Sequence, residues 1–347
     1  MTISTPPVSS TGESSAEAIA MRGLAGFYVA DCSATWVQIV DSLAENVLAA
    51  EGRSLVRLLK AGGFKLLRHP GWRLLLPQKA PQLPLTIPAD FIVKGNNDKW
   101  IAFDLKRGWV ARKLASRELY QREMWIRSIP EVAAISPPIL RWDPDEMVFW
   151  EVYQPGRPAA VHDLDEGIKV LKRLWPRLAA VYKVRTSCER LETPELRKDP
   201  PLEYVVREAG LESSWRRLEG QPVNQGLVHG DLKHLNVLVQ ADAIWVIDWG
   251  EQFFIGPPLF DVLYFLYWHS RSYTPETVVG RAFASADWLR EPLPESLQPS
   301  AVEASLAVFA REMVDRIKEE GTRKRSLKKL VRFLKTAGGR LRELADA

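Results

Sequence analysis

The stretch LVHGDLKHLNVLVQADAIWVIDWGE, residues 227–251, constrains the fold of this chain more than any other segment. Apolar runs on either side of a short polar break predict a loop that leads into a β-hairpin. Asp231 and Asn236 fall on that loop, and Asp248 falls at the end of the second strand. We therefore expect the local fold to bring these three polar side chains together.

This trio has the composition that phosphoryl transfer requires. The reaction needs one carboxylate beside the accepting hydroxyl, and it needs oxygen ligands that hold Mg²⁺ against the nucleotide phosphates. A single carboxylate cannot do both, so two acids and an amide at separate points of the chain favour this chemistry. Asp and Asn are also common in ordinary loops, where they hydrogen-bond the backbone. The order and spacing of the whole pattern therefore carry the argument.

Two motifs in this stretch stand in a fixed order. H-G-D-x-x-x-x-N occupies residues 229–236, and D-W begins 17 residues after the aspartate of the first motif. The pair resembles the catalytic and metal-binding motifs of the aminoglycoside phosphotransferase and choline kinase family, a branch of the protein-kinase-like fold. The resemblance extends over residues 91–347 and leaves the first 90 residues outside it. It implies an α+β bilobal fold, with ATP and Mg²⁺ as cofactors.

The resemblance assigns a role to each polar residue of the two motifs. Asp231 is implied to be the catalytic base, and Asn236 and Asp248 are implied to ligate Mg²⁺. Lys233 stands where related kinases place a lysine that reaches the γ-phosphate. His229 is expected to support the loop rather than to react.

An upstream strand supplies a second motif. V-A-R-K at residues 110–113 has the form of the strand whose lysine pairs with the α- and β-phosphates. Strand alternation puts Trp109 and Lys113 on one face, so Lys113 is expected to point at the nucleotide. Its ion-pair partner should come from the following helix. Glu123, in REMWIRSIPEV, is the better candidate, and Glu118 is the alternative.

Two further assignments follow from position alone. Gly95 begins the turn G-N-N-D where the phosphate-covering turn should lie, but the turn lacks G-x-G-x-x-G and suits an ordinary hairpin equally well. Glu151 and Tyr153 fall where backbone groups would bind adenine. Gly156 follows them and is expected to loosen the connection between the lobes.

The composition and the pattern of apolar residues divide the chain into three parts. Residues 1–88 form an extension with a disordered tail, basic amphipathic helices and a Pro-rich linker at residues 77–88. Residues 89–153 alternate short apolar runs with turn residues, which predicts a small, mostly-β N-lobe. Residues 154–347 are dominated by helical patterns, which predicts a larger, mostly-α C-lobe ending in a basic helix.

The spacing after Asp248 bears on the acceptor. Only 12 residues separate it from Asp261 of GPPLFDVLYFL, which matches a family aspartate that braces the catalytic loop. Conventional protein kinases need a long activation segment and an A-P-E anchor there, and they carry H-R-D in place of H-G-D. We therefore expect the hydroxyl of a small molecule or glycan as acceptor. An atypical protein kinase and a nucleotide-binding scaffold without turnover are the alternatives.

The region after D-W is rich in aromatic side chains, which either stack on an acceptor ring or pack between helices. Acidic residues that would hold a cationic aminoglycoside are only scattered there, so an antibiotic is not the first expectation. The aromatic residues are Phe253, Phe254, Tyr264, Phe265, Tyr267, Trp268 and Tyr273.

Basic amphipathic segments lie towards both ends of the chain. Residues 323–342 hold nine Lys or Arg and no acid, and seven Lys or Arg lie between Glu51 and Asp90. Such helices either lie on an anionic membrane or glycolipid, or pack their apolar faces on the catalytic domain. The first interpretation would make the acceptor a membrane-linked sugar, such as part of a lipopolysaccharide. The apolar face of the C-terminal segment consists of Leu327, Leu330, Val331, Leu334 and Leu341.

Bulk properties narrow the class of protein. The net charge of +4 is too small to imply a nucleic-acid partner, and none is expected. Cys32 and Cys188 stand far apart without C-x-x-C spacing, which fits a reducing, cytoplasmic compartment. No run of about 18 uncharged apolar residues exists, so peripheral contact at the inner face of a membrane is the only membrane association expected.

Overall fold

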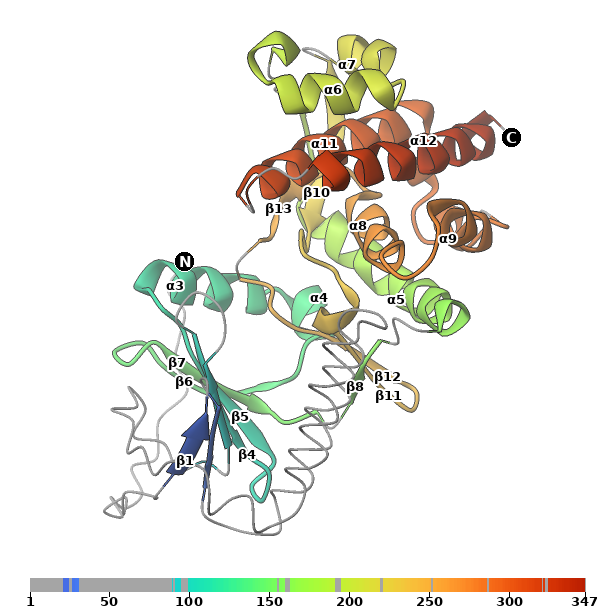
Figure 1. Cartoon of the computed structure of the whole chain (residues 1–347). Helices are drawn as coiled ribbons and strands as arrows, with labels where there is room; N and C mark the ends of the chain where they lie inside the picture. The colour runs from blue at the N-terminus through green and yellow to red at the C-terminus, as the bar shows by residue number, and fades with distance from the viewer. Residues whose placement is uncertain are drawn as a thin grey trace.

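The computed structural model contains a small sheet lobe and a larger helical lobe (Figure 1). This confirms the expected α+β bilobal architecture. The predicted helices of the N-terminal extension, the Pro-rich linker and the turn that begins at Gly95 lie outside the described residues. The structure describes residues 21–24, 27–30, 89, 91–94, 99–154, 156–159, 163–190, 195–218, 221–250, 252–285, 287–319, 321 and 324–346.

The N-lobe is built on an antiparallel sheet in the order β1-β2-β3-β4-β5-β7-β6. The β-strands expected for residues 89–153 are present, and neighbouring strands pair antiparallel: β3 with β4, β4 with β5, and β6 with β7. Two strands that were not predicted, β1 and β2, extend the same sheet through pairing of β2 with β3. The strands are β1 Met21–Leu24, β2 Phe27–Ala30, β3 Phe91–Lys94, β4 Trp100–Asp104, β5 Trp109–Lys113, β6 Ile139–Asp143 and β7 Val148–Val152.

Helix α3, Arg117–Arg127, lies against this sheet, and the short helix α4, Pro130–Ala133, follows it towards the C-lobe (Figure 1). Helix α3 begins at Ser116, whose side chain accepts a hydrogen bond from the backbone N–H of Leu119. It ends at Arg127, and α4 begins three residues later with a proline at its first position. Helix α3 thereby presents its buried face to β5 and β7.

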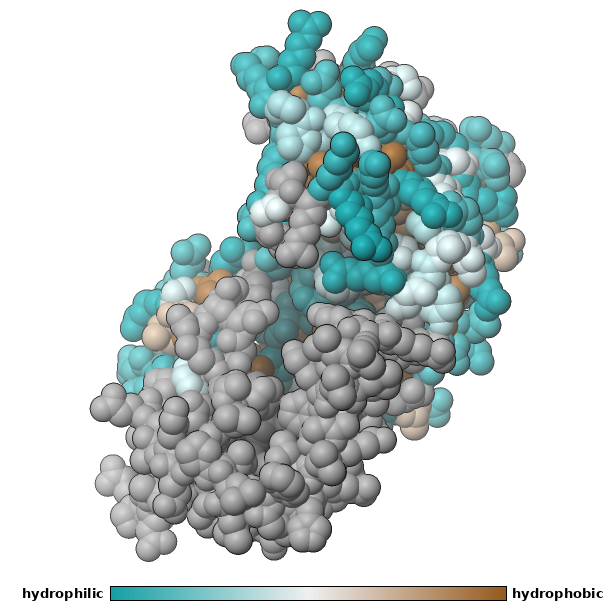
Figure 2. Space-filling view, viewed as in Figure 1, coloured by the Kyte–Doolittle hydropathy of each residue, from teal (hydrophilic) through white to brown (hydrophobic). Residues whose placement is uncertain are grey.

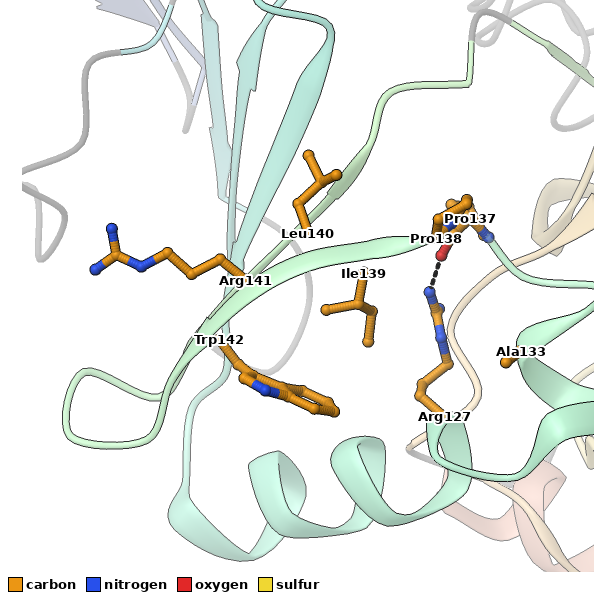
Figure 3. A pocket seen from close by; sticks show the side chains of 8 residues that line it. All are labelled: Arg127, Ala133, Pro137, Pro138, Ile139, Leu140, Arg141 and Trp142. Carbon is orange, nitrogen blue, oxygen red and sulfur yellow. Dashed lines mark hydrogen bonds between the residues drawn. The ribbon is translucent and has the colours of Figure 1, made fainter. Parts of the chain in front are cut away.

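A bulge changes the side-chain pattern of β6. The pairing of β6 with β7 is irregular between Ile139 and Arg141. Ile139 and Trp142 consequently both point toward α3, while Leu140 points to the other side of the strand (Figure 3). They help to line a hollow in which Arg127 donates a hydrogen bond to the carbonyl of Pro137. This hydrogen bond connects the end of α3 to the segment that leads into β6.

A small sheet connects the lobes. Strand β8, Arg157–Pro158, pairs with β11, Val237–Gln240, which forms a hairpin with β12, Ala243–Val246. This confirms the hairpin expected from the sequence. A third sheet, ordered β13-β10-β9, lies in the C-lobe and comprises β9 Ser187–Arg190, β10 Pro222–Val228 and β13 Phe254–Gly256.

Helices make up most of the C-lobe. Helix α8 is buried on nearly every side, in keeping with its almost wholly apolar sequence. Helices α11 and α12 pack against each other near the C-terminus (Figure 1). The helices are α5 Leu164–Val184, α6 Pro200–Glu208, α7 Glu212–Leu218, α8 Phe260–His269, α9 Pro275–Ala282, α10 Asp287–Arg290, α11 Pro299–Glu319 and α12 Lys324–Asp346, with 3₁₀ turns η2 Leu196–Lys198, η3 His234–Asn236 and η4 Pro294–Leu297.

The basic C-terminal helix packs its apolar face inward. Leu330, Leu334 and Leu341 of α12 are fully buried, and Leu327 and Val331 are nearly so. Lys324, Lys328 and Lys335 are exposed in the same helix. Of the two interpretations of this helix, packing on the catalytic domain is therefore the one that accounts for its apolar face. Among the described residues, no helix is long and apolar enough to cross a membrane.

Candidate active site

The loop after β10 is held by a buried aspartate. Asp261, near the start of α8, accepts hydrogen bonds from the backbone N–H groups of His229 and Gly230, at 2.8 and 2.9 Å. Its burial raises the pKa of this carboxyl, although His229 and the two backbone donors oppose that rise. Nε2 of His229 lies 2.9 Å from the carbonyl oxygen of Ile247, so the ring connects the loop to the end of the hairpin. The expected bracing by Asp261 and support by His229 are both present.

Gly230 is required by the shape of this loop. Its φ of +78° lies in the region that favours glycine. A Cβ atom there would lie 2.1 Å from the carbonyl oxygen of Gln252. The glycine of H-G-D therefore lets the loop pass against the segment that follows D-W.

Asp231 lies at the centre of a hydrogen-bond network. Oδ1 accepts from the hydroxyl of Tyr264 at 2.7 Å, while Oδ2 accepts from Nζ of Lys233 at 2.7 Å and Nδ2 of Asn236 at 3.0 Å. A guanidinium nitrogen of Arg316 lies 3.6 Å from Oδ1. Burial would raise the pKa of Asp231, but Lys233 and the hydrogen bond from Tyr264 outweigh it and lower the pKa. The carboxylate is therefore ionised and fixed in orientation.

Helix α11 supports this network from the C-terminal part of the chain. Arg316 donates one hydrogen bond to the hydroxyl of Tyr264 at 2.6 Å and another to the carbonyl of Gly230 at 2.7 Å. Its guanidinium also lies over the Tyr264 ring, 4.8 Å from the centroid. Tyr264, which the sequence presented only as one of several aromatic residues, thus links Arg316 to Asp231.

Asn236 and Asp248 lie on adjoining segments. The amide of Asn236 donates to the backbone carbonyl of Asp231 at 2.9 Å as well as to its carboxylate, which leaves the amide oxygen of Asn236 as an acceptor. Its backbone carbonyl accepts from the N–H of Ile247, the residue before Asp248. Asp248 has a φ of +62° and a side chain that is 34% exposed.

The residues present fit a hard divalent cation. An amide oxygen from Asn236 and a partly exposed carboxylate from Asp248 are the ligand types that Mg²⁺ takes when nucleotide phosphates and water complete its shell. Within the part of the chain that the structure describes, no group of three or more His, Cys, Asp or Glu residues forms a closed metal site. An open site with few protein ligands suits a metal that arrives with a nucleotide.

Arg112 reaches this site from β5. Its guanidinium donates to Asp248 at 2.9 Å and to Glu151 at 2.7 Å. Burial would lower the pKa of the Arg112 guanidinium, but Glu151 and Asp248 outweigh this effect and raise the pKa. The guanidinium therefore stays charged. In turn, Arg112 and Lys99 hold the pKa of Asp248 low against the opposing effect of burial.

Lys113 faces a different way from the one expected. Its Nζ lies 3.1 Å from Glu146, in the turn between β6 and β7. Trp109 and Ala111 share a face of the sheet as the alternation predicted, but that face packs in an apolar cluster. The opposite face, with Arg112, looks toward α3 and Asp248. The sequence pattern indicated the alternation correctly and could not say which face meets the site.

Glu123 enters the site from α3, whereas Glu118 is exposed. Oε2 of Glu123 accepts from the backbone N–H of Gly250 at 2.5 Å, and Oε1 lies 3.8 Å from Arg127. Burial raises the pKa of Glu123, and Arg127 partly opposes this rise. Glu123 therefore fixes the segment that carries D-W and lies near Arg112.

Glu151 and Tyr153, which were assigned by position, both have partners within the N-lobe. The side chain of Glu151 is buried between Arg112 and Arg127, accepting from the latter at 3.3 Å. The backbone N–H of Tyr153 donates to the carbonyl of Gly108 at 2.9 Å, so this donor is already used within the N-lobe. The structure thus gives Glu151 a role in the ion-pair network, which the sequence analysis did not foresee.

The fold and the site together define a class. A sheet lobe and a helical lobe joined at β8, a braced H-G-D loop and an adjacent D-W segment are the features of a phosphotransferase of the protein-kinase-like fold that acts on hydroxyl groups. The family model described as the phosphotransferase enzyme family matches residues 153–296, which contain both motifs. This match confirms the resemblance inferred from the motifs.

Solved structures of other proteins align with this chain at low sequence identity. A choline/ethanolamine kinase family protein from Mesorhizobium loti aligns at 15% identity over 70% of this chain and 92% of that one, with a TM-score of 0.41. An aminoglycoside phosphotransferase from Alicyclobacillus acidocaldarius aligns at 10% identity over 74% and 92%, with a TM-score of 0.47. An ethanolamine kinase from Plasmodium vivax aligns at 12% identity over 87% and 94%, with a TM-score of 0.41. No curated protein sequence matches this chain.

Proposed function

We propose that this protein transfers the γ-phosphoryl group of ATP to a hydroxyl of a small molecule or glycan, with Mg²⁺ as cofactor. The network around Asp231 is the observation that carries the proposal. Three neighbouring donors hold this carboxylate ionised, and a second carboxylate, Asp248, lies on the adjoining segment. That division matches the two tasks of the reaction, since one acid serves the acceptor and the other serves the metal–nucleotide complex.

Each residue has a defined part in this mechanism. Asp231 orients the acceptor hydroxyl and takes its proton, while Asn236 and Asp248 hold the metal. When bound, Mg²⁺ neutralises part of the phosphate charge. Lys233, which bonds Asp231 at 2.7 Å, lies where it can stabilise charge on the transferring group. Arg112, in place of Lys113, is proposed to bind the nucleotide phosphates, because it is the cation of β5 beside Asp248.

A non-protein acceptor is favoured by the short segment after Asp248. Residues 254–256 of this segment form β13, which pairs with β10 from Gly226 to Val228. A segment fixed in a sheet in this way has no room for the long activation segment of conventional protein kinases. An atypical protein kinase is the second candidate, and a scaffold without turnover is the third.

A membrane-linked glycan is the finer form of the proposal. Its support is the row of exposed cations on α12, including Lys324, Lys328 and Lys335. Because the apolar face of this helix is buried, any contact with an anionic surface would depend on charge and would weaken with salt. Flotation with anionic liposomes, using the wild type and a variant with these three lysines changed to Gln, tests this form. Equal recovery with both proteins contradicts it.

Transfer of label from γ-labelled ATP to a panel of acceptors tests the function itself. The panel contains sugars, sugar phosphates, amino alcohols, lipid-linked glycans and a protein mixture. Asp231→Asn should lose transfer, while Asp242→Asn, the same change at an exposed site of the β11–β12 turn, should retain it. Labelling of proteins alone would favour the second candidate. Nucleotide binding without transfer or hydrolysis would favour the third.

A further inference from the structure

We infer that the acceptor carries an anionic group, a phosphate or a carboxylate, which is bound by Arg271, Arg325 and Lys329 beside the catalytic loop. This inference rests on the proposed function and adds the chemical class of the acceptor. Arg271 lies two residues after the end of α8, and Arg325 and Lys329 lie in the first two turns of α12. We call them the cation cluster.

A continuous series of contacts connects the cluster to the catalytic carboxylate. Nζ of Lys233 lies 2.7 Å from Asp231 and 5.7 Å from the centroid of the Trp268 ring. The guanidinium of Arg271 lies over the same ring, 3.5 Å from its centroid. Because these distances join end to end, they set an upper limit on the separation of Arg271 from Asp231. A sugar or a similarly small molecule can span that separation.

The cluster concentrates positive charge. Nζ of Lys329 lies 6.0 Å from the centroid of the Tyr267 ring. Partial burial, together with Arg271 and Arg325 nearby, lowers the pKa of Lys329 to about 8. Arg271 and Arg325 therefore lie close enough to Lys329 for their charges to add to the effect of burial.

The acidic side chains that the structure describes do not pair with the cluster. Among the described residues, no carboxylate lies within salt-bridge distance of Arg271, Arg325 or Lys329. Two acids of the adjoining helices are committed elsewhere, since Glu276 pairs with Arg332 at 2.8 Å and Asp315 pairs with Lys318 at 2.9 Å.

Helix α12, which bears Arg325 and Lys329, adds to the positive potential at the cluster. Helix α12 begins at Lys324 and has no acidic residue in its first turn, so no side chain of that turn offsets the positive end of its dipole. Hydrophilic side chains gather over α11 and α12 on the face shown in Figure 2. An anion at the cluster would relieve the mutual repulsion of the cations and would interact favourably with the N-terminal end of α12. A cationic acceptor would meet repulsion at the same place.

Binding measurements without ATP test this inference. Titration calorimetry would compare inorganic phosphate, glucose 6-phosphate, glucose and glucosamine as probes of different charge. We expect the two phosphates to bind and the neutral and cationic sugars to bind at least about tenfold more weakly. Vesicles that carry a lipid-linked sugar phosphate form a second arm, which separates a soluble anion from a membrane-linked one.

Variants locate the binding. Arg271→Gln combined with Lys329→Gln should weaken phosphate binding about a hundredfold, whereas Lys328→Gln with Lys335→Gln, exposed on the same helix, should leave it unchanged. The affinity for AMP-PNP should be the same in all of these proteins, which separates the cluster from the nucleotide site. Arg271→Gln alone, at an exposed residue, provides a version in which folding is not at risk.

Two results would overturn the inference: equal binding of charged and neutral probes in both arms, or phosphate binding that the cluster variants do not alter. Asp231→Asn should lose phosphoryl transfer and keep phosphate binding. If neither the wild type nor any variant transfers phosphate but the cluster still binds anions, the proposed function fails and the anion site stands. If transfer occurs to neutral acceptors as readily as to anionic ones, the function stands and the anion site fails.

Discussion

Replacing Tyr264 by Phe removes one hydroxyl from the catalytic network and leaves the ring in place. That hydroxyl donates to Oδ1 of Asp231 at 2.7 Å and accepts from Arg316 at 2.6 Å. A hydrogen bond to a charged group contributes about 1.5–3 kcal/mol, so kcat/KM should fall roughly 10- to 100-fold if Asp231 must be fixed for transfer. Arg316 retains its bond to the carbonyl of Gly230, which limits the disturbance.

The pH dependence of this variant gives a second measure. The hydrogen bond from Tyr264 is one of the contributions that lower the pKa of Asp231. Without it the pKa rises, and the acid limb of the kcat/KM profile should move to higher pH by up to about one unit, which corresponds to about 1.4 kcal/mol. Because the folded-state pKa is depressed, the stability contributed by Asp231 is present above its unfolded pKa and is lost as pH falls through the folded value. The variant should therefore lose less stability on acidification.

The assay is transfer from γ-labelled ATP to the acceptor found by the panel, measured between about pH 5 and 9. Tyr182→Phe is the matched control, since its hydroxyl donates to the carbonyl of Asn224 at 3.0 Å, away from the loop. This control should change thermal stability without changing the pH profile. An unchanged kcat/KM together with an unmoved acid limb in Tyr264→Phe would refute the reasoning.

Three other changes have defined outcomes. Arg112→Gln should raise the Kd for AMP-PNP by about tenfold or more in titration calorimetry, and Arg112→Lys should recover only part of the loss because Lys cannot bond Asp248 and Glu151 together. Gly250→Ala should destabilise the fold by about 1–3 kcal/mol in urea unfolding, because its Cβ would lie 2.2 Å from Oε2 of Glu123; full stability would contradict this packing. Lys329→Met should raise the free energy of unfolding at pH 7 by about 1 kcal/mol, because the folded state disfavours the charged ammonium group of Lys329. This figure already allows for the partial exposure of the side chain. Stability of the wild type should then rise with pH above about 8, a rise that should be absent from the variant.

The local chemistry of this site could be predicted because it lies within one short stretch. Asp231, Asn236 and Asp248 are positioned by a loop and a hairpin that the apolar runs specify, so the pattern indicated both the strands and the residues between them. Asp261 lies only 13 residues after Asp248, and the helix that carries it is marked by its continuous apolar sequence.

Residues that depend on long-range packing could not be predicted in the same way. Arg316 meets Asp231 from α11, 85 positions later in the sequence, and no periodic pattern marks which arginine of that helix faces the loop. The choice between Arg112 and Lys113 depended on which face of β5 meets α3, which alternation leaves open. Strands β1 and β2 lack the alternating pattern that would have revealed them, and they owe their place to pairing with β3.

Binding of metal and nucleotide by two aspartate variants tests the central claim most directly. Titration of AMP-PNP in the presence and absence of Mg²⁺ would be compared for wild type, Asp231→Asn and Asp248→Asn. The account predicts that Asp248→Asn loses the metal-dependent part of nucleotide affinity, while Asp231→Asn keeps it and loses only phosphoryl transfer. Metal-dependent binding by Asp248→Asn equal to that of the wild type, or transfer by Asp231→Asn at the wild-type rate, would contradict it.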